Sequence, residues 1–454
     1  MKKTLILAAA PLLLCACFGR PAPGGPRRSG RQIGAVLPGE PDLALARGGS
    51  PGGWYFAWAP ADGGAAAPLG LAHADPAGVV TRLEGSDDDG AARLEPGLAA
   101  AGPSLFASWL ERSSGTLSLV TAVYALPEGE RQLEARVAAL SRHVRGRAVI
   151  APSGLDSAFV AWEDYSPPAE DSFVGIAEIG PEGLRWKETL GNKEPGERYM
   201  MPALAADGAG GVFAAFRHVH NGDKGVVVRH FSPGGEGWPD DVRTTDAVSY
   251  KSGPSLTVDD AGSIFAVWAD GRGGGQGLYA QKISSAGAVL WDPAGMPLAA
   301  PGGNHRAAAL ASDGAGGFFC AWIDDNNGAK WELKLQRLDR GGRQLWGPDG
   351  VAAQPSASWQ SEPSLTPDGA GGAIVAWTES RYGYLDLFAQ RFGPDGERLW
   401  QEDGVRVSAG SGDKSGPRLA GDGAGGCVLS WKRSAGKRWK IAAQRLDAKG
   451  ALMW

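Results

Sequence analysis

Cysteines and long hydrophobic runs are both scarce in this sequence. Only 4 of its 454 residues are cysteines, and two of them, Cys15 and Cys17, lie near the start. A scaffold held together by disulfides, which needs many closely spaced cysteines, is therefore excluded. Residues 5–14 form an apolar run, but this run is too short to cross a bilayer as a helix.

Sequence signatures of catalysis are also missing. The chain has no nucleophile elbow, no phosphate-binding loop and no paired-cysteine metal motif. No helical pattern follows the glycine-rich stretch that begins at Gly271, so it is not a dinucleotide-binding fingerprint. His218 and His220 could form a metal pair, but the sequence offers no third ligand beside them. We therefore assign no catalytic residue and expect no metal and no cofactor.

The charge balance argues against a nucleic-acid partner. Residues 1–31 carry six basic and no acidic side chains, which leaves 39 of the 45 basic residues against all 50 acidic ones in the remaining chain. Nucleic-acid-binding domains usually display a clustered basic face. The body of this protein is acidic, so we expect no binding to nucleic acid.

A repeat runs through almost the whole chain. An aromatic residue ends a short apolar run at Trp58, Trp109, Trp162, Phe216, Trp268, Trp322, Trp377 and Trp431, at intervals of 51 to 55 residues. The turn DGAGG precedes it in four units, beginning at Asp207, Asp313, Asp368 and Asp422. In the last four units a tryptophan stands ten residues after a glutamine, in the pairs Gln281 and Trp291, Gln336 and Trp346, Gln390 and Trp400, and Gln444 and Trp454. The chain therefore contains eight related units.

Each unit has the pattern of β-strands. Apolar residues alternate with period two in AIVAW, from Ala373, and in LFAQRF, from Leu387, between turns rich in Gly and Asp. Four strands repeated at this interval are typical of a β-propeller blade. We predict an all-β fold, a β-propeller of eight four-stranded blades, with seven blades as the alternative if the irregular first units merge. The last unit lacks its fourth strand, so Gly34-Ala35-Val36-Leu37 is predicted to complete it and close the ring.

The start of the chain has the pattern of an export signal. Lys2 and Lys3 precede the apolar run, and Leu14-Cys15-Ala16-Cys17 resembles the bacterial lipobox, in which a cysteine after a small residue is lipidated. Cys17 is the predicted lipidation site, because Ala16 precedes it. An ordinary cleaved signal peptide is the alternative. Residue 18 is not Asp, which by resemblance to lipoprotein sorting in double-membraned bacteria favours the outer membrane.

These patterns divide the chain into three parts. We predict a lipoprotein signal peptide over residues 1–17 and the propeller domain over residues 32–454. Between them, residues 18–31 are rich in Pro, Gly and Arg and have no periodic apolar pattern, so we expect a flexible tether.

Candidate binding residues are aromatic and fall in two sets of loops. Because strand direction alternates, the loops between the second and third strands and the loops between blades emerge on the same side of the ring, here called the long-loop face. Aromatic side chains there could stack on sugar rings or anchor a protein partner, and the alternative is that they pack the loops against one another. The candidates are Tyr165, Trp331, Tyr382, Tyr384 and Trp439 in the first set, and Tyr199, Tyr250 and Trp359 in the second.

Acidic residues recur two positions after the unit aromatic. They are Glu111, Asp164, Asp270, Asp324 and Glu379, and an arginine follows two positions later in two units, at Arg272 and Arg381. A ring of carboxylates could hold a cation or act as acid and base. Recurrence favours instead an ion pair that stabilises each blade, because a catalytic site needs residues that are unique to a few blades.

The repeat also carries a family resemblance. Its pattern of DGAGG, AW, AQR, LW and DGV resembles the repeats of exported bacterial β-propeller lipoproteins over residues 41–454. This resemblance implies the fold and carries no activity. The stretch GPDGERLW, from Gly393, is superficially similar to the sialidase box S-x-D-x-G-x-T-W, but its serine is absent and its glycine stands one place early. The lipid-anchored eight-bladed scaffold of the outer-membrane β-barrel assembly machinery is similar in architecture only.

Together these features favour a binding or scaffolding module without catalysis. We expect it to be exported, lipid-anchored to the cell envelope and monomeric, and to bind an envelope protein or a glycan through its long-loop face while the lipid anchor holds it to the membrane. The alternative is an enzyme that acts on extracellular glycans, a glycoside hydrolase or a sialidase-like protein, which is an argument from fold alone.

Overall fold

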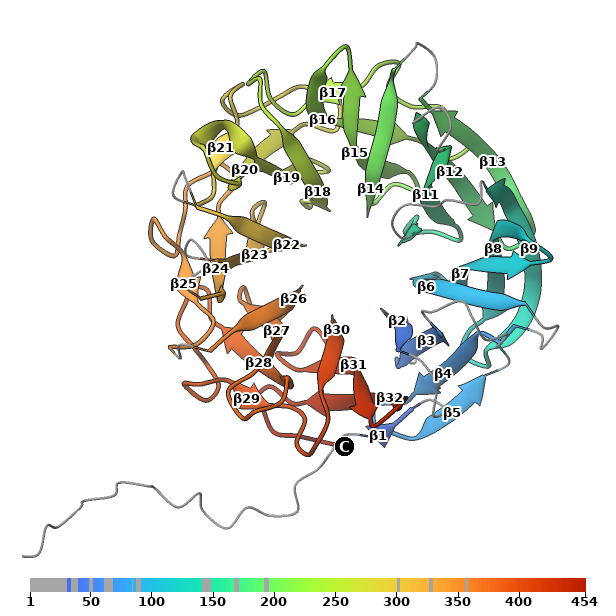
Figure 1. The fold of residues 1–454 in the computed structure, drawn as a ribbon, viewed down its shortest axis with the longest axis vertical. Helices are drawn as coiled ribbons and strands as arrows, with labels where there is room; N and C mark the ends of the chain where they lie inside the picture. Colours follow the sequence, from blue (N-terminus) through green and yellow to red (C-terminus); the bar gives the residue numbers. More distant parts are fainter. Residues whose placement is uncertain are drawn as a thin grey trace, which may run out of the picture.

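The computed structural model describes residues 31–454, apart from residues 34–39, 49–51, 61–67, 84, 87–90, 141–147, 167–170, 192–195, 300–302, 326–329 and 356–357. The strands form eight four-stranded antiparallel sheets, arranged as blades around a central opening (Figure 1). The predicted eight-bladed β-propeller is therefore confirmed, and the alternative of seven blades is wrong.

The first four blades follow the chain in order, each with its first strand innermost (Figure 1). Blade 1 contains β2 (Pro41–Arg47), β3 (Trp54–Pro60), β4 (Gly70–Ala74) and β5 (Val80–Leu83), and blade 2 contains β6 (Ala92–Ala101), β7 (Ser104–Ser113), β8 (Thr116–Ala125) and β9 (Glu130–Leu140). Blade 3 contains β10 (Val149–Pro152), β11 (Ala158–Ser166), β12 (Asp171–Gly180) and β13 (Gly183–Leu190), and blade 4 contains β14 (Arg198–Ala206), β15 (Val212–His220), β16 (Asp223–Phe231) and β17 (Val242–Arg243).

The last four blades repeat this plan with very short outer strands. Blade 5 contains β18 (Lys251–Val258), β19 (Ile264–Asp270), the 3-10 turn η1 (Gly271–Gly273), β20 (Gly277–Ile283) and β21 (Met296–Pro297), and blade 6 contains β22 (His305–Ser312), β23 (Phe318–Asp324), β24 (Glu332–Leu338) and β25 (Val351–Ala352). Blade 7 contains β26 (Gln360–Pro367), β27 (Ala373–Glu379), β28 (Asp386–Phe392) and β29 (Val405–Arg406). Blade 8 contains β30 (Lys414–Gly421), β31 (Cys427–Ala435) and β32 (Arg438–Leu446).

The two ends of the described chain meet in blade 8. Its fourth strand is β1 (Arg31–Gln32), which lies antiparallel to β32 with Arg31 opposite Ala443. The amide of the next residue, Ile33, donates to the Ile441 carbonyl at 3.0 Å. The sequence-based prediction placed this strand at Gly34-Ala35-Val36-Leu37, which lies outside the described residues. Arg31, expected to end the tether, belongs to the strand.

A glutamine in the third strand explains the constant spacing to the tryptophan that follows it. In blade 7, the side-chain oxygen of Gln390 accepts hydrogen bonds from the backbone amides of Arg391 (2.9 Å) and Trp400 (3.1 Å). Its side-chain nitrogen donates to the carbonyl of Gln401 at 2.6 Å. Gln281, Gln336 and Gln444 make the equivalent bonds in their own blades. One buried amide thus fixes the return of the chain toward the outer strand, and an insertion would break it.

The DGAGG turns are held by their aspartates. Asp368 accepts the backbone amides of Ala370 at 2.7 Å and Gly372 at 2.8 Å, as expected for an Asp at a tight turn. Gly369 and Gly371 have φ values of 79° and 87°, which favour glycine. The second carboxylate oxygen of Asp368 accepts from Arg391 Nε at 2.8 Å, so the turn is tied to the third strand of its own blade.

The hydrophobic core lies between neighbouring blades. Trp377 of blade 7, for example, packs in one cluster with Ala321 and Leu335 of blade 6. Cys320 and Cys427 are buried free thiols, as predicted from their positions in different blades, and burial raises the pKa of both. A single blade cannot cover its own faces, so stability depends on the neighbours. Nowhere in the described chain is there a helix long and apolar enough to cross a membrane.

Candidate functional site

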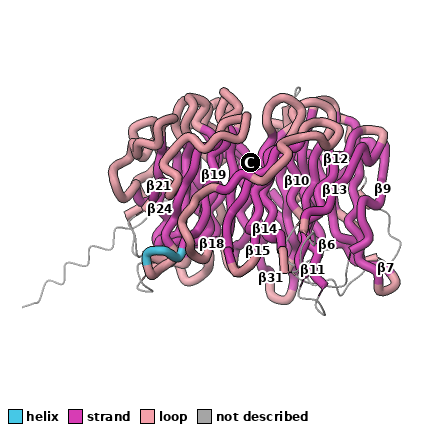
Figure 2. Tube along the Cα trace, turned by 90° about the horizontal axis from the view of Figure 1, so that it is seen from above, coloured by secondary structure: helices cyan, strands magenta, loops and turns pink. Residues whose placement is uncertain are grey.

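The long-loop face carries most of the predicted binding residues. In Figure 2 the strands stand side by side between two layers of loops, and η1, which follows the second strand of blade 5, marks this face as the lower layer. Tyr250, Trp359, Tyr382 and Tyr384 are 45%, 47%, 55% and 48% exposed, respectively. Tyr165, Trp331 and Trp439 are half-buried. Large aromatic side chains are thus presented to solvent at several positions on one side of the ring, which is a common property of binding surfaces.

Tyr199 departs from the prediction, because it is buried. Its ring packs edge-on against Phe216, with 5.9 Å between ring centroids, and lies 4.5 Å from that of His218. Its hydroxyl donates to Asp241 Oδ2 at 2.5 Å. Burial, together with this hydrogen bond, raises the pKa of Tyr199 far above its ordinary value. Tyr199 therefore packs between strands, which was the alternative role for the candidates, and it does not face a ligand.

Ring contacts join just one pair of the eight candidates within the described parts of the chain. Trp331 of blade 6 and Trp359, in the loop that leads to blade 7, meet edge-on with 5.3 Å between centroids. Among the other exposed candidates, Tyr382 and Tyr384 share the loop between β27 and β28, and Tyr250 lies in the loop before blade 5. Tyr382 stacks on Phe388 of its own blade at 6.2 Å, so one side of its ring is covered.

A basic side chain lies over several of these aromatic rings, a feature that the sequence-based prediction missed. The guanidinium carbon of Arg217 lies 4.5 Å from the ring centroid of Tyr250, and Lys224 Nζ lies 5.8 Å from it. Arg306 lies over Trp331 at 5.0 Å, and Arg406 lies over Tyr382 at 4.3 Å. These distances are in the range of cation–π interactions. The available signal was local, since Arg217 directly follows the unit aromatic, a place where the next three units have Ala, Ile and Thr.

The recurrent carboxylates are paired inside the blades. Glu379 accepts from Arg381 Nε at 2.6 Å and from the indole nitrogen of Trp377 at 2.8 Å, and its side chain is fully buried. Asp324 meets Lys334 Nζ at 2.9 Å. Ion pairs also hold Glu111, through the buried Arg93 and the exposed Arg136, while Asp164 is buried at the same place in blade 3. The predicted stabilising ion pair therefore describes these residues better than a ring of free carboxylates.

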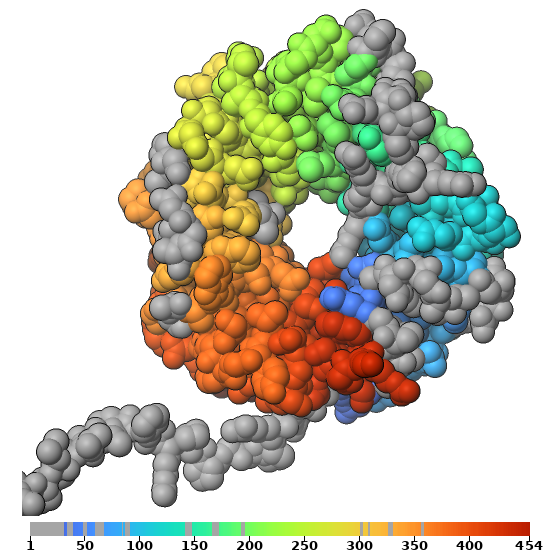
Figure 3. Space-filling model, in the orientation of Figure 1, coloured from blue at the N-terminus to red at the C-terminus, as the bar shows by residue number. Residues whose placement is uncertain are grey.

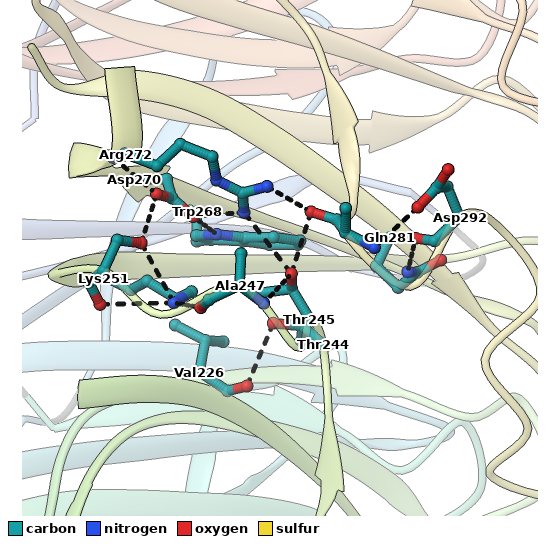
Figure 4. A network of polar contacts seen from close by, with 12 residues as sticks. Val226, Thr244, Thr245, Ala247, Lys251, Trp268, Asp270, Arg272, Gln281 and Asp292 are labelled. Atoms are coloured by element: carbon teal, nitrogen blue, oxygen red, sulfur yellow. Dashed lines mark hydrogen bonds and ion pairs between the residues drawn. The ribbon is translucent and has the colours of Figure 1, made fainter. Parts of the chain in front are cut away.

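Asp270 is the centre of a larger polar network between blades 4 and 5 (Figure 4). It accepts hydrogen bonds from Ser249 Oγ (2.6 Å), the Trp268 indole nitrogen (3.1 Å) and Arg272 Nη2 (2.6 Å). Burial opposes the charge of Asp270, but these donors outweigh burial and lower its pKa to about 2. The nearby ammonium of Lys251 is fully buried and donates to the carbonyl of Ala247 at 2.5 Å, and burial lowers its pKa.

This network predicts a pH-dependent contribution to stability. The folded-state pKa of Asp270 lies below its unfolded value, so its contribution is present above about pH 4 and disappears as the pH falls through about 2. Asp270→Asn should therefore lower the free energy of unfolding near neutral pH by roughly 2 kcal/mol, and the gap to wild type should shrink between about pH 4 and pH 2. Urea unfolding over this pH range measures the gap. Asp260→Asn, at an exposed carboxylate, serves as control, and a gap that is constant with pH would contradict the prediction.

Metal binding finds no support in the described residues. His218 and His220 have ring centroids 6.2 Å apart, and His218 Nε2 lies 3.3 Å from Glu197 Oε1. Across the described ranges, no group of three or more His, Cys, Asp or Glu side chains could hold a metal ion. Cys17, the predicted lipidation site, lies outside the described residues.

The described wall of the central opening is lined by uncharged side chains. A cavity of about 570 Å³ is bounded by the innermost strands β10, β14, β18, β22 and β26, and Figure 3 shows the opening at the centre of the ring. Side chains such as Ile150, Leu204 and Leu256 line it, and its described wall contains no charged residue.

Comparison with known proteins yields similarity to other propellers and no family. No protein-family model matches this chain, and no curated protein sequence matches it. Among solved structures, it is similar to a polysaccharide lyase, PL25 ulvan lyase bound to -[GlcA(1-4)Rha3S]- (13% identity, 78% of this chain and 92% of that chain, TM-score 0.48). It is also similar to a prolyl endopeptidase (15% identity, 87% and 54%, TM-score 0.49) and to the Penicillium chrysogenum alpha-L-arabinanase (10% identity, 93% and 99%, TM-score 0.39). Similarities this low carry no argument about what the chain binds or does.

Proposed function

We propose that this protein is a cell-envelope lipoprotein that works as a non-catalytic binding or scaffolding module through its long-loop face. The observation that supports this most is the contrast between two sets of side chains. Exposed aromatic residues such as Tyr250 and Trp359 are available to a ligand, whereas carboxylates such as Asp270 and Glu379, which a hydrolase would need, are paired with arginines. An extracellular glycan-active enzyme is the other candidate class.

Partner capture tests the binding role. Crosslinking in intact cells, followed by purification of the full-length protein, should recover a stoichiometric envelope protein or a bound glycan. Trp359→Ala with Tyr384→Ala should reduce that recovery by about tenfold or more, because exposed aromatic anchors commonly dominate such interfaces. Leu184→Ala, an exposed apolar residue in the outer strand β13, is the control. Equal recovery of the partner by the wild-type protein and by the Trp359→Ala, Tyr384→Ala variant would contradict the proposal.

A turnover assay separates the two classes. An enzyme should release products from an extracellular polysaccharide, and neutralising one or two carboxylates should abolish release while binding remains. The binding module should release no product under conditions in which it binds. Product formation by the wild-type protein from a polysaccharide that it binds would favour the enzyme.

The lipid anchor is tested separately. Cys17→Ala should move the protein from the membrane fraction to the soluble fraction, because no lipid could then be attached at the predicted site. Cys15→Ala is the matched control and should leave the protein in the membrane fraction. Membrane association that survives Cys17→Ala would show that the anchor is at Cys15 or is not a lipid.

A further inference from the structure

Blade 4 has no carboxylate at two cross-strand positions that are acidic in blades 6 and 7. The pairing of residues across strands shows which positions correspond in different blades. Glu379 is paired with Asp386 in blade 7, and Asp324 is paired with Glu332 in blade 6. The same register in blade 4 pairs His218 with Gly225. Both acidic positions of blade 7 and blade 6 are thus occupied by residues without negative charge in blade 4.

Three basic side chains lie on one face of the blade 4 sheet at the long-loop end. Arg198 and Lys224 both lie opposite Val219, and Arg217 lies two residues before Val219 on the same strand. Residues paired across strands, and residues two apart along a strand, share a sheet face, so the three cations point to the same side. Val226, also on that side, packs against Trp268 of blade 5, which shows that this face is turned toward blade 5.

None of these three cations has an ion-pair partner in the described part of the chain. The carboxylates next to Arg198 and Lys224 in the sequence are held by other side chains: Glu197 by His218 at 3.3 Å, and Asp223 by Arg243 at 2.5 Å. The Nε atoms of Arg198 and Arg217 are buried without a hydrogen-bond partner. Positive charge without an ion-pair partner stands out in a body with 39 basic and 50 acidic residues.

An exposed aromatic ring completes the cluster. Tyr250, in the loop that leads from blade 4 to blade 5, is 45% exposed and lies within cation–π range of Arg217 and Lys224. Its carbonyl accepts from the Gly271 amide at 2.9 Å, which fixes the loop to η1. The ring is therefore held in place beside the cations.

We propose that Tyr250, Arg217, Lys224 and Arg198 form a site for an acidic sugar residue, one that carries a carboxylate or a sulfate group. The ring of Tyr250 would stack on the apolar face of the sugar, and the guanidinium and ammonium groups would bind the anion. Further exposed aromatics at Trp359 and Tyr382, over blades 6 and 7, would suit the next residues of a polymer. Arg306 and Arg406 near them are already paired with Asp325 and Asp386, so the anion is recognised mainly at blade 4. The inference rests on the proposed binding function and specifies its ligand.

Calorimetry with defined probes tests this site. The purified full-length protein should bind hexagalacturonate, bind the neutral cellohexaose at least about tenfold more weakly, and lose affinity for hexagalacturonate as salt rises. Arg217→Ala with Lys224→Ala should weaken hexagalacturonate binding about tenfold or more, because each removes a charge-assisted contact. Lys437→Ala with Lys440→Ala removes two cations from the corresponding end of blade 8, one in the loop and one in β32, and should change affinity less than about twofold. Lys224→Glu, at an exposed position, should weaken binding without disturbing the fold.

Several results would overturn the inference. Equal affinity for cellohexaose and hexagalacturonate, tighter binding of hexaglutamate than of hexagalacturonate, no binding of hexagalacturonate, or equal losses in the blade 4 and blade 8 variants would each do so. The proposed function fails on a different result, namely recovery of the same partners from cells with wild type and with the Trp359→Ala, Tyr384→Ala variant. A stoichiometric envelope protein captured by a chain that does not bind hexagalacturonate would leave the proposed function standing and remove this site.

Discussion

Trp377→Ala should lower the free energy of unfolding by about 3 to 5 kcal/mol, the cost typical of removing a fully buried tryptophan. The side chain is 0% exposed and packs in the cluster shared by blades 6 and 7. Its ring stacks on Phe388 with 6.0 Å between centroids, and its indole nitrogen donates to Glu379 Oε2 at 2.8 Å. Alanine would leave a cavity between two blades and remove one donor from a buried carboxylate, so both packing and polar contacts are lost. Urea unfolding measures the effect.

Trp359→Ala is the matched control for this substitution. This substitution also removes a tryptophan, in the loop that leads into blade 7, but the side chain is 47% exposed. We therefore expect the free energy of unfolding to change by no more than about 0.5 kcal/mol. Trp377→Phe keeps an aromatic ring and loses the indole donor, and its effect should lie between the two. A cost below about 1 kcal/mol for Trp377→Ala would mean that the interface between blades 6 and 7 relaxes around the cavity, contrary to the close packing inferred here.

The architecture could be predicted from the sequence because each blade repeats the same short sequence motifs. The aromatic that ends the second strand, the Asp that begins the DGAGG turn and the glutamine of the third strand all make contacts within their own blade or with its neighbour. Gln390, for example, bonds to residues only one to eleven positions away. Residues that make such contacts recur at regular intervals in the sequence, so counting the repeated motifs predicts the number of blades.

The candidate site could be predicted only in part, because its properties depend on contacts between residues that are not part of the repeated motif. The burial of Tyr199 depends on Asp241, which is 42 residues later and in the outer part of the same blade. Likewise, the placement of Arg198, Arg217 and Lys224 side by side follows from strand register, since Arg198 and Lys224 both lie opposite Val219. A sequence pattern identifies the aromatic residues, but strand register is needed to find the unbalanced cations beside them.

The closing strand illustrates the same limit. The pairing that the structure describes is at Arg31–Gln32, followed by Ile33, while the predicted segment Gly34-Ala35-Val36-Leu37 lies outside the described residues. Ile33 is 6% exposed and shares a cluster with Ile441 and Ala443, so burial of one isoleucine accompanies this register. Register depends on which side chain reaches the core, and a short apolar segment alone does not fix it.

Asp386→Ala should also destabilise the protein strongly, by about 3 to 5 kcal/mol, because it leaves buried positive charge without a partner. Asp386 and Lys414 are both 0% exposed, and Lys414 Nζ meets Asp386 Oδ1 at 2.7 Å across the interface between blades 7 and 8. Asp386 also accepts from Arg406. In the variant, Lys414 would keep only the carbonyl of Gly410 among its described acceptors, at 2.6 Å.

The corresponding lysine of blade 5 explains why the expected cost is high and how it could be relieved. Lys251 is the counterpart of Lys414, because it is paired across strands with Asp270 as Lys414 is with Arg433. In the preceding blade, Gly225 occupies the position that corresponds to Asp386 in blade 7. The ammonium of Lys251 is held by the carbonyls of Ala247 and Ser249 and by the Ser249 hydroxyl, at 2.5, 3.3 and 3.2 Å. In blade 8 the only described acceptor of Lys414 besides Asp386 is the Gly410 carbonyl, the counterpart of the Ala247 carbonyl, so this lysine depends on the carboxylate. Adding Lys414→Met to Asp386→Ala should therefore restore part of the lost stability, since an apolar side chain needs no partner. A double variant less stable than Asp386→Ala alone would show that the interface depends on the lysine for packing, and that the charge of Lys414 is not the source of the cost.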